Sequence, residues 1–421
     1  MKVLWFSNIP ALGSEKINEG SKIKSTGGWL HSLNKVMQDE VELSIAFHYH
    51  QNISKFIYQK TNYYPIFNGN IIVESIKSRF LGKIYDTDFI DQYLSIINDV
   101  KPDIIHLHGT ENPFLCILEH IDIPIVISIQ GNLTVYYHKF LAGYHGRHIA
   151  LMDNYINWKT LLLGRQSFLK TFRNMKKMSL TEQHYLISAE NIIGRTSWDR
   201  RISRILAPRS NYFVGNEILR EGFYNNKWNN VYDSGKIVIT TINGDNYYKG
   251  FETLAHSLSL LIGLGLEVEW RVAGISQGSL INRITKRELG RKYPKSGLVL
   301  LGAIDEESLI ENMLDSHLYI MTSHIENSPN NLCEAMMLGM PCISSFAGGT
   351  ESMMENGNEG LLIQDGDPWS LAGAIIELLS DREKLKFFGM NARNRALERH
   401  NKDKVLNEFI SIYSSVLKVA R

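Results

Sequence analysis

Short runs of apolar residues alternate with amphipathic helical patterns along most of the chain, and the alternation occurs in two series. Runs of this length between turn residues predict buried β-strands over residues 3–6, 42–47, 104–107 and 125–129, and then over 237–242, 267–272, 299–301, 318–321, 342–345 and 360–363. The intervening patterns predict helices that include residues 28–37, 251–264, 307–315, 334–338 and 368–379. Because strands that alternate with helices form parallel sheets covered on both faces, the pattern predicts an α/β fold with two sheets. A less regular polar stretch, residues 207–234, is the expected connection between them.

The size and composition of the chain agree with two ordinary globular domains. A chain of 421 residues is long for one hydrophobic core, and its hydrophobic content of 44% is average. The formal net charge of +1 gives no general attraction to nucleic acid, so we expect no nucleic-acid partner. Three scattered cysteines are too few for a disulfide framework or a zinc site. No apolar run reaches about 18 residues, and the first residues read as a buried strand rather than a signal peptide, so we expect a cytoplasmic protein.

Two glutamates, Glu326 and Glu334, stand eight positions apart on either side of a polar turn. The turn contains Pro329, Asn330 and Asn331, and the second glutamate begins an apolar helical pattern. Unpaired N–H groups in the first turn of a helix carry partial positive charge and can hold a diphosphate. A carboxylate one turn further on can accept two hydrogen bonds from a ribose diol. The pattern therefore indicates a nucleotide-sugar site, and the alternative is a core helix whose first turn carries ordinary surface acids.

The residues around these glutamates resemble the E-x7-E region of the retaining glycosyltransferases of family 4. The resemblance is carried by the stretch from Glu326 to Glu351, E-N-S-P-N-N-L-C-E-A-M-M-L-G-M-P-C-I-S-S-F-A-G-G-T-E. It continues upstream through Lys249-Gly250-Phe251 and Arg271-Val-Ala-Gly274. Residues 237–400 carry the strong resemblance, whereas the N-terminal half is similar in layout more than in motif.

This resemblance implies the GT-B fold, in which two Rossmann-like domains face a central cleft. We expect an acceptor-binding domain over residues 1–215, a nucleotide-sugar-binding domain over residues 216–403, and a C-terminal helix over residues 404–421 that packs back on the first domain. The implied activity is the transfer of a sugar, with retention, from a nucleoside-diphosphate sugar to the hydroxyl of a glycan or lipid-linked acceptor. The resemblance implies no metal and no cofactor, and it implies a place in bacterial surface polysaccharide or glycolipid synthesis.

The resemblance also assigns roles to residues of the second domain. It implies that Glu334 holds the donor ribose hydroxyls, that Glu326 lies near the transferring sugar, and that Lys249 contacts the donor diphosphate. The remaining donor-binding positions that we expect are Asn243, Asn330, Asn331, Leu332, Gly349 and Thr350. The family usually has an arginine shortly before the lysine, and this chain has Gly244 there. The paired cationic clamp of the family is therefore incomplete.

In the first domain the expected site residues follow predicted strands. Gly27 and Gly28 follow a strand and a polar loop, and a glycine pair lets the backbone approach a phosphate closely. His108 ends a strand and could act in acid–base chemistry or bind sugar hydroxyls. Gln130 ends the next strand, where many relatives have a histidine; an amide can hydrogen-bond to a sugar but cannot transfer a proton. Arg195 lies in a segment that resembles a family segment near the cleft.

Residues 138–177 interrupt the first series with eight lysines and arginines, a single acid, Asp153, and interleaved aromatic residues. Basic amphipathic helices with aromatic residues favour anionic membrane surfaces, and they also suit a phosphate-bearing acceptor. This pattern predicts a peripheral protein on the inner face of the plasma membrane. The alternative is a pair of core-packed helices with solvated lysines.

Two other functions stay open from the sequence. One is another enzyme of the same shape, such as a nucleotide-sugar 2-epimerase, which would need no acceptor. The other is a non-catalytic scaffold that binds a glycan or a nucleotide. Gly244 in place of the arginine and Gln130 in place of the histidine favour the scaffold. The presence of Glu326, Glu334 and Lys249 argues against it.

Overall fold

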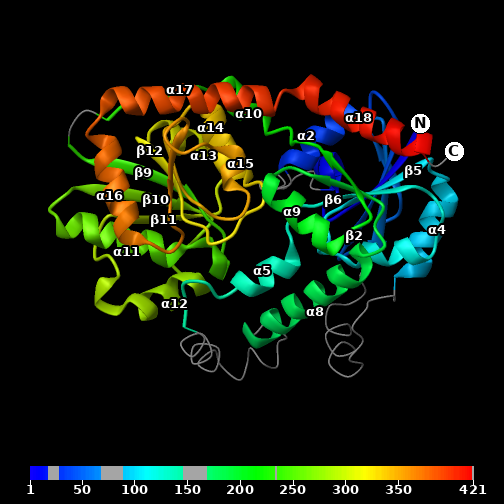
Figure 1. Ribbon diagram of the computed structural model, residues 1–421, viewed down its shortest axis with the longest axis horizontal. Helices are drawn as coiled ribbons and strands as arrows, with labels where there is room; N and C mark the ends of the chain where they lie inside the picture. Colours follow the sequence, from blue (N-terminus) through cyan, green and yellow to red (C-terminus); the bar gives the residue numbers. More distant parts are fainter. Residues whose placement is uncertain (18–27, 68–88, 146–167, 233–234, 420–421) are drawn as a thin grey trace. The chain divides into compact units, whose positions relative to one another are not determined.

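The computed structural model describes residues 1–17, 28–67, 89–145, 168–232 and 235–419 (Figure 1). The chain divides into two compact domains, the first made of Met1–Tyr137, Trp158–Ile218 and Lys402–Arg421, and the second of His138–Asn157 and Leu219–Asn401. The chain thus changes domain after Ile218 and again after Asn401, where the sequence analysis placed the boundaries after residues 215 and 403. Residues 138–145, which we expected in the first domain, group with the second.

The first domain is built on an eight-stranded sheet with the strand order β3-β4-β2-β1-β5-β6-β7-β8. Neighbouring strands are parallel except β3 and β4, which pair antiparallel. The strands are β1 Lys2–Ser7, β2 Glu42–Tyr49, β3 Phe56–Tyr58, β4 Thr61–Phe67, β5 Ile104–His108, β6 Ile125–Ser128, β7 Asn191–Gly194 and β8 Asn211–Val214. Strand order reverses between β1 and β5, in the middle of the sheet.

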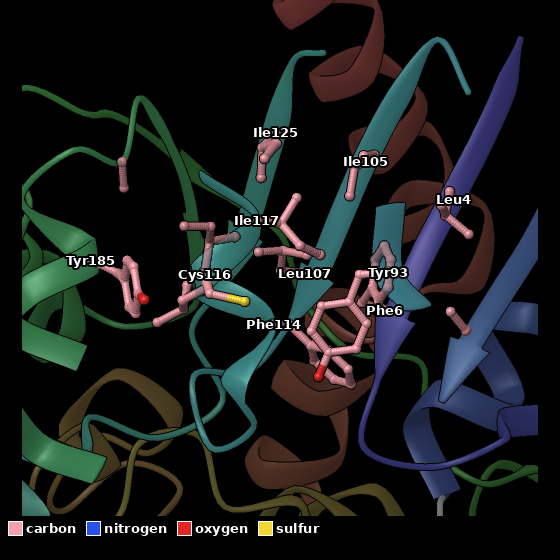
Figure 2. Packing of buried hydrophobic residues seen from close by; sticks show 14 of the residues in the cluster. Leu4, Phe6, Tyr93, Ile105, Leu107, Phe114, Cys116, Ile117, Ile125 and Tyr185 are labelled. Carbon is pink, nitrogen blue, oxygen red and sulfur yellow. The ribbon is translucent and has the colours of Figure 1, made fainter. Parts of the chain in front are cut away.

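Helices cover both faces of this sheet, and the residues of β1 alternate between the two cores. Leu4 and Phe6 belong to one buried cluster, whereas Val3 and Trp5 belong to the other, as the two-residue period of a strand requires. Figure 2 shows the first of these clusters, in which Tyr93 of α4 packs beside Phe6. The helices of this domain are η1 Ala11–Gly13, α1 Ser14–Ile17, α2 Gly28–Met37, α4 Ile90–Val100, η2 Pro113–Glu119, α5 Leu133–Lys139, α8 Phe168–Leu186, α9 Ser197–Leu206 and α18 Lys402–Val419.

The C-terminal helix α18, red in Figure 1, belongs to the core of the first domain. Its buried residues Val405, Phe409 and Tyr413 recur every four positions, which places them on one face of the helix. They pack in the same cluster as Trp5, whose indole N–H donates to the Tyr413 hydroxyl at 3.1 Å. The prediction that the last helix packs back on the first domain is confirmed.

The second domain is built on a six-stranded, fully parallel sheet with the order β11-β10-β9-β12-β13-β14. The strands are β9 Ile237–Ile242, β10 Val268–Ala273, β11 Leu298–Gly302, β12 Leu318–Met321, β13 Cys342–Ser345 and β14 Gly360–Ile363. The helices are α10 Glu221–Asn225, η3 Tyr247–Lys249, α11 Phe251–Gly263, α12 Leu280–Leu289, η4 Gly290–Lys292, α13 Glu306–Leu314, α14 Asn330–Leu338, α15 Thr350–Met353, α16 Pro368–Leu379 and α17 Arg382–Arg399. Two parallel sheets with helices between their strands confirm the predicted α/β fold.

None of the described helices is both long enough and apolar enough to cross a bilayer. Within the same residues, no group of three or more His, Cys, Asp and Glu side chains is arranged to hold a metal ion.

Candidate functional site

Strand order in the second sheet reverses between β9 and β12, because the chain adds β10 and β11 on one side of β9 and then β12, β13 and β14 on the other. In open parallel sheets, ligands bind beyond the carboxyl ends of the strands at such a reversal. Lys249 lies in the connection that follows β9, and Glu326 lies in the connection that follows β12. The topology therefore brings together two residues that are 77 positions apart in the sequence.

Lys249 and Glu326 form a partly buried ion pair at this point, with side chains 22% and 7% exposed. Lys249 Nζ donates to Glu326 Oε1 at 2.6 Å, and the Ser323 hydroxyl donates to the same oxygen at 2.7 Å. Burial disfavours the Lys249 ammonium, but the charge and hydrogen bond of Glu326, together with Tyr248, outweigh that effect, and the pKa of Lys249 lies above its usual value. An ammonium has three N–H donors. One of them is bonded to Glu326, and the ammonium also lies 5.8 Å from the centroid of the Tyr248 ring. Since no other hydrogen-bond acceptor of Lys249 occurs among the described residues, Lys249 can also bind an anion.

Two glycines with positive φ allow the loops around this pair to approach one another. Gly250, at φ +68°, follows Lys249, and a Cβ there would lie 1.8 Å from the carbonyl oxygen of Thr322. Gly348, at φ +58°, follows β13, and a Cβ there would lie 2.0 Å from the carbonyl oxygen of Glu326. A side chain at either position would push the loop away, so both glycines are needed for the position of the ion pair.

The N-terminus of α14 lies in the connection after β12 and has no side-chain cap. The N–H groups of Leu332 and Cys333 both bond to the Pro329 carbonyl at 3.1 Å. The preceding N–H groups, of Asn330 and Asn331, have no acceptor among the described residues. Because they lie at the positive end of the helix dipole, these two groups are suited to hold a phosphate. Leu332, which the sequence analysis also expected to offer its N–H, already uses it within the turn.

Glu334, one turn further along α14, is bound by Arg220. Nε and Nη2 of Arg220 donate to Oε1 and Oε2 of Glu334 at 2.7 and 2.8 Å, which makes a bidentate pair. The side chain of Glu334 is 7% exposed. Burial raises the pKa of the Glu334 carboxyl above its usual value, and the Arg220 guanidinium opposes that rise. The carboxylate expected to hold a ribose is therefore fixed in orientation by an arginine.

The sequence of the second domain matches a known family. Residues 224–395 fit the family model described as glycosyl transferases group 1. The second domain belongs to this family.

The chain is similar to several curated proteins over less than half of their length. The chain is 31% identical over 113 residues to N-acetyl-alpha-D-glucosaminyl L-malate synthase of Bacillus anthracis, covering 27% of this chain and 30% of the relative. It is 25% identical over 171 residues to the capsular polysaccharide biosynthesis glycosyltransferase CapM of Staphylococcus aureus, covering 40% and 44%. It is 27% identical over 140 residues to UDP-Gal:alpha-D-GlcNAc-diphosphoundecaprenol alpha-1,3-galactosyltransferase of Escherichia coli, covering 33% and 35%. The match thus spans less than half the length of each of these relatives.

Solved structures are similar over the whole chain. Sucrose-phosphate synthase of Thermosynechococcus elongatus aligns with a TM-score of 0.72 at 12% identity, covering 99% of both chains. Anabaena HepE, solved in complex with UDP and glucose, aligns with a TM-score of 0.62 at 14% identity, covering 99% of this chain and 100% of its own. At these identities the likeness shows the fold alone, and it shows that the chain has the GT-B fold.

Other expected donor-binding residues of the group 1 domain hold its loops together. Asn243 Nδ2 donates to the Lys249 carbonyl at 3.1 Å, and Asn331 Nδ2 donates to the Ile242 carbonyl at 3.0 Å. The Gly349 N–H donates to the Glu326 carbonyl at 2.9 Å. The Thr350 hydroxyl donates to the Ser345 carbonyl and accepts from the Ala347 N–H, both at 3.0 Å, and Thr350 is fully buried. These contacts give the side chains of Asn331 and Thr350 a structural role. They leave the Asn243 Oδ1 atom, buried and without a donor among the described residues, as a polar atom of the site.

His108 of the first domain lies under aromatic rings rather than at an open edge. Its ring centroid is 4.6 Å from that of Trp5, 5.7 Å from that of Trp29 and 3.8 Å from that of His106. The side chain is fully buried, and neither ring nitrogen has a partner among the described residues. Burial and the neighbouring His106 hold the pKa of His108 well below its usual value. His108 is therefore a neutral, enclosed imidazole.

The remaining expected residues of the first domain lie at the same edge of its sheet. Gly28 begins α2, whereas Gly27 lies outside the described residues. The Gln130 side chain is close to Gly109, where a Cβ would lie 3.3 Å from its amide carbon. Arg195 is buried, lies 3.3 Å from Glu217 and stacks on the Trp29 ring with its guanidinium 4.3 Å from the ring centroid. Arg195 therefore helps to enclose the aromatic group around His108.

Arg220 is the residue of the candidate site that sequence reasoning missed. It lies within residues 207–234, which we treated as a connection. Arg220 and Glu334 are 114 positions apart, so no local spacing relates them. The missed signal is weak: an arginine that follows two apolar residues, Ile218 and Leu219, at the start of a domain.

The basic segment 138–177 is described in part. Phe140 and Tyr144 are buried at 3% and 8% exposure, and Lys139 Nζ lies 3.5 Å from Asp365 Oδ2. Phe140 and Tyr144 thus pack within the second domain and are not available to a membrane surface, whereas the Lys139 side chain is 47% exposed. Residues 146–167 lie outside the described residues. Membrane association through this segment stays a prediction.

Proposed function

We propose that this chain is a retaining glycosyltransferase that moves a sugar from a nucleoside-diphosphate sugar to a hydroxyl acceptor. The observation that carries the proposal is the grouping of one cation, two carboxylates and an uncapped helix N-terminus at the strand-order reversal of a glycosyl transferases group 1 domain. Each of these groups suits a different part of a nucleotide sugar.

The diphosphate would bind between Lys249 and the first turn of α14. The free N–H groups of Asn330 and Asn331 and the remaining donors of Lys249 face no acceptor among the described residues. Charge on the diphosphate grows as the sugar leaves, so a fixed cation and fixed amides stabilise the transition state more than the ground state. In this proposal the leaving-group charge is carried by protein groups, and no metal or cofactor takes part.

The transfer itself would take place beside Glu326. The acceptor oxygen forms a bond to the anomeric carbon on the face from which the diphosphate leaves, while the bond from that carbon to the phosphate oxygen breaks. The acceptor proton passes to the departing phosphate. Glu326 stabilises the positive charge that develops on the sugar ring, and retention of configuration follows from attack and departure on one face. The enclosed, neutral His108 takes no proton in this scheme.

A glycan or lipid-linked acceptor in surface polysaccharide synthesis fits this proposal. The named functions of the CapM and galactosyltransferase relatives support that class of acceptor. For the membrane association predicted for residues 138–177, flotation with vesicles of anionic lipid is the direct test. Salt-sensitive flotation is expected, and no binding to such vesicles would contradict it.

The proposed activity is tested first by calorimetric binding of UDP, GDP, ADP, CMP and dTDP in the presence of EDTA. UDP comes first because HepE was solved in complex with it. We expect saturable binding of one nucleotide and then, with the matching nucleotide sugar and an acceptor, a product with the donor's anomeric configuration by NMR. Inverted configuration would contradict retention, turnover without acceptor would indicate an epimerase, and no nucleotide binding would contradict the transferase.

A further inference from the structure

Arg220 covers one edge of the Glu334 carboxylate completely. It lies at the N-cap of α10, directly after the chain enters the second domain, and Glu334 lies on α14. Its two donated hydrogen bonds reach a different oxygen each, at 2.7 and 2.8 Å. Glu334 accepts no other hydrogen bond from the described residues.

The guanidinium is itself held from two further directions. Its carbon lies 4.7 Å from the centroid of the Phe223 ring, and Nη1 lies 3.8 Å from Glu306 Oε2. The Arg220 side chain is 26% exposed. A planar cation stacked on a ring and paired with two carboxylates has little freedom left, so it can impose one orientation on Glu334.

A carboxylate offers about four lone-pair positions, two on each oxygen. Arg220 uses one position on each oxygen, so one position on each oxygen remains. The two remaining positions point to opposite sides of the carboxylate, so two adjacent hydroxyl donors, such as the 2′- and 3′-hydroxyls of a ribose, can approach the free position of one oxygen. A buried carboxylate without a cation would instead tend to take up a proton, and a protonated oxygen would accept less well.

We propose that Arg220 is a positioning residue that keeps Glu334 ionised and turned so that the free acceptor position of one of its oxygens faces the 2′- and 3′-hydroxyls of a ribonucleotide. The inference rests on the proposed function of the same site. It adds a residue that touches no substrate and a consequence that the proposed function alone does not require, which is that Arg220 sets the preference for ribose over deoxyribose.

The test is a comparison of two ligands and two proteins. The nucleoside diphosphate that binds best among UDP, GDP and ADP is compared with its 2′,3′-dideoxy form, by calorimetry, in the unchanged protein and in Arg220→Met. The unchanged protein is expected to prefer the ribonucleotide by roughly 10- to 100-fold, the usual effect of hydrogen bonds to a charged group. In Arg220→Met the affinity for the ribonucleotide falls and the two affinities converge.

The pH dependence gives a second readout. Without the guanidinium, burial and the charge of Glu306 both raise the pKa of the Glu334 carboxyl, which then takes up a proton at a higher pH. The ratio of ribonucleotide to dideoxynucleotide affinity, in which titration of the terminal phosphate cancels, should therefore fall in Arg220→Met as the pH is lowered from 8, whereas the same ratio in the unchanged protein stays level. Arg220→Lys restores the charge but not the fork, so it should restore the level pH profile and only part of the ribose preference.

Arg271→Met is the matched control, because Arg271 also bonds two carboxylates of the same domain, Glu269 and Asp315, at 2.7 Å each. It should leave the ribose preference unchanged. If Arg220→Met weakens both ligands equally and keeps their ratio, Arg220 is a structural residue and the proposal is overturned. If the unchanged protein binds both ligands equally, Glu334 does not hold the ribose, and the proposal fails while the proposed function stands. If Arg220→Met does not fold, Arg220→Lys decides: a reduced ribose preference supports the proposal, and an unchanged preference overturns it. Failure of every nucleotide to bind overturns the proposed function and this inference together.

Discussion

Each sheet reverses its strand order between two central strands, and the residues beyond the carboxyl ends of those strands differ between the two domains. In the second domain this place carries charged groups, the Lys249–Glu326 pair above all, and these groups retain bonding capacity toward a ligand. In the first domain the corresponding place between β1 and β5 is enclosed by rings, with His108 between Trp5 and Trp29. Its cation, Arg195, is paired with Glu217 and stacked on Trp29. Buried charges cost desolvation free energy, whereas buried rings stabilise a fold. The comparison indicates that the strand-order reversal of the second sheet is suited to hold an anion. The described residues at the reversal of the first sheet are suited to packing.

The largest effect we expect is a loss of stability caused by a cavity in the core of the first domain. Phe409 of α18 is fully buried in the cluster that contains Trp5. Phe409→Ala should lower the free energy of unfolding of the first domain by about 3–5 kcal/mol, measured by denaturant unfolding, and should leave nucleotide affinity unchanged. Leu417→Ala, a partly buried position of the same helix, is the milder control. A loss of nucleotide binding in folded Phe409→Ala would contradict the assignment of packing to this part of the first domain and of nucleotide binding to the second domain.

Removing the Lys249 ammonium from the second domain should slow catalysis. Lys249→Met is expected to lower kcat by roughly 10²- to 10³-fold, the usual effect of deleting one group that stabilises developing charge. Steady-state kinetics with the matching nucleotide sugar measures this. Lys236→Met, at an exposed lysine of the same domain paired with Glu269, should leave kcat unchanged. Equal kinetics for the two variants would contradict the role of Lys249.

The two domains should also respond to pH in opposite directions. Burial, with a smaller contribution from Arg195, lowers the pKa of His106 in the first domain to about 3. Its unfolded form takes up a proton below about 6.5, so the stability contributed by neutral His106 is present above that pH and is lost as the pH falls. His324 in the second domain is opposite: burial disfavours its charge, but the bonded Glu252 and Asp365 outweigh that effect and raise its pKa. Its contribution is full below about pH 6.5 and is lost as the pH rises through the folded pKa.

Unfolding measured between pH 4 and 9 tests this contrast. Each histidine should contribute a slope of up to about 1.4 kcal/mol per pH unit within its own window. His106→Gln should remove the acid-side slope, and His324→Gln should remove the slope above pH 6.5. The same slope in both variants and the unchanged protein would show that neither histidine governs it.

The smallest effect we expect is a gain. A Cβ at Gly244 would meet only the Asn246 amide nitrogen, at 3.4 Å, so an arginine fits there. Gly244→Arg should add a second cation near the diphosphate and strengthen nucleotide binding severalfold, by roughly 1 kcal/mol for a partly exposed charge. Gly263→Arg adds the same charge where nothing lies within 4 Å of the Cβ, and calorimetry should show no gain. A gain in both variants would indicate a general charge effect.

Much of the fold could be predicted because its central strands are continuous apolar runs. The predicted strands over residues 237–242, 318–321, 342–345 and 360–363 have the bounds found in the structure. Four strands of the first sheet, β3, β4, β7 and β8, were missed because each is short or has its apolar residues interrupted by polar ones. The helix expected from Glu334 begins at Asn330, since Pro329 starts it without the side-chain cap that marks most helix N-termini.

The candidate site could be predicted only where its residues are close in sequence or fit a family motif. Glu326 and Glu334 flank one turn, so their spacing was informative. The partner that fixes Glu334 comes from Arg220, at the other end of the domain, and only tertiary packing relates the two. The enclosure of His108 depends in the same way on Trp29, a residue of another element.

The central claim is that the second domain holds a nucleoside diphosphate at the strand-order reversal of its sheet. A crystal structure of the chain with the nucleotide that binds best tests this claim most directly. We expect the diphosphate at Lys249 and at the N–H groups of Asn330 and Asn331, with the ribose hydroxyls on Glu334 and the Arg220 pair still intact. A nucleotide bound elsewhere, or one whose ribose lies away from Glu334, would contradict the account.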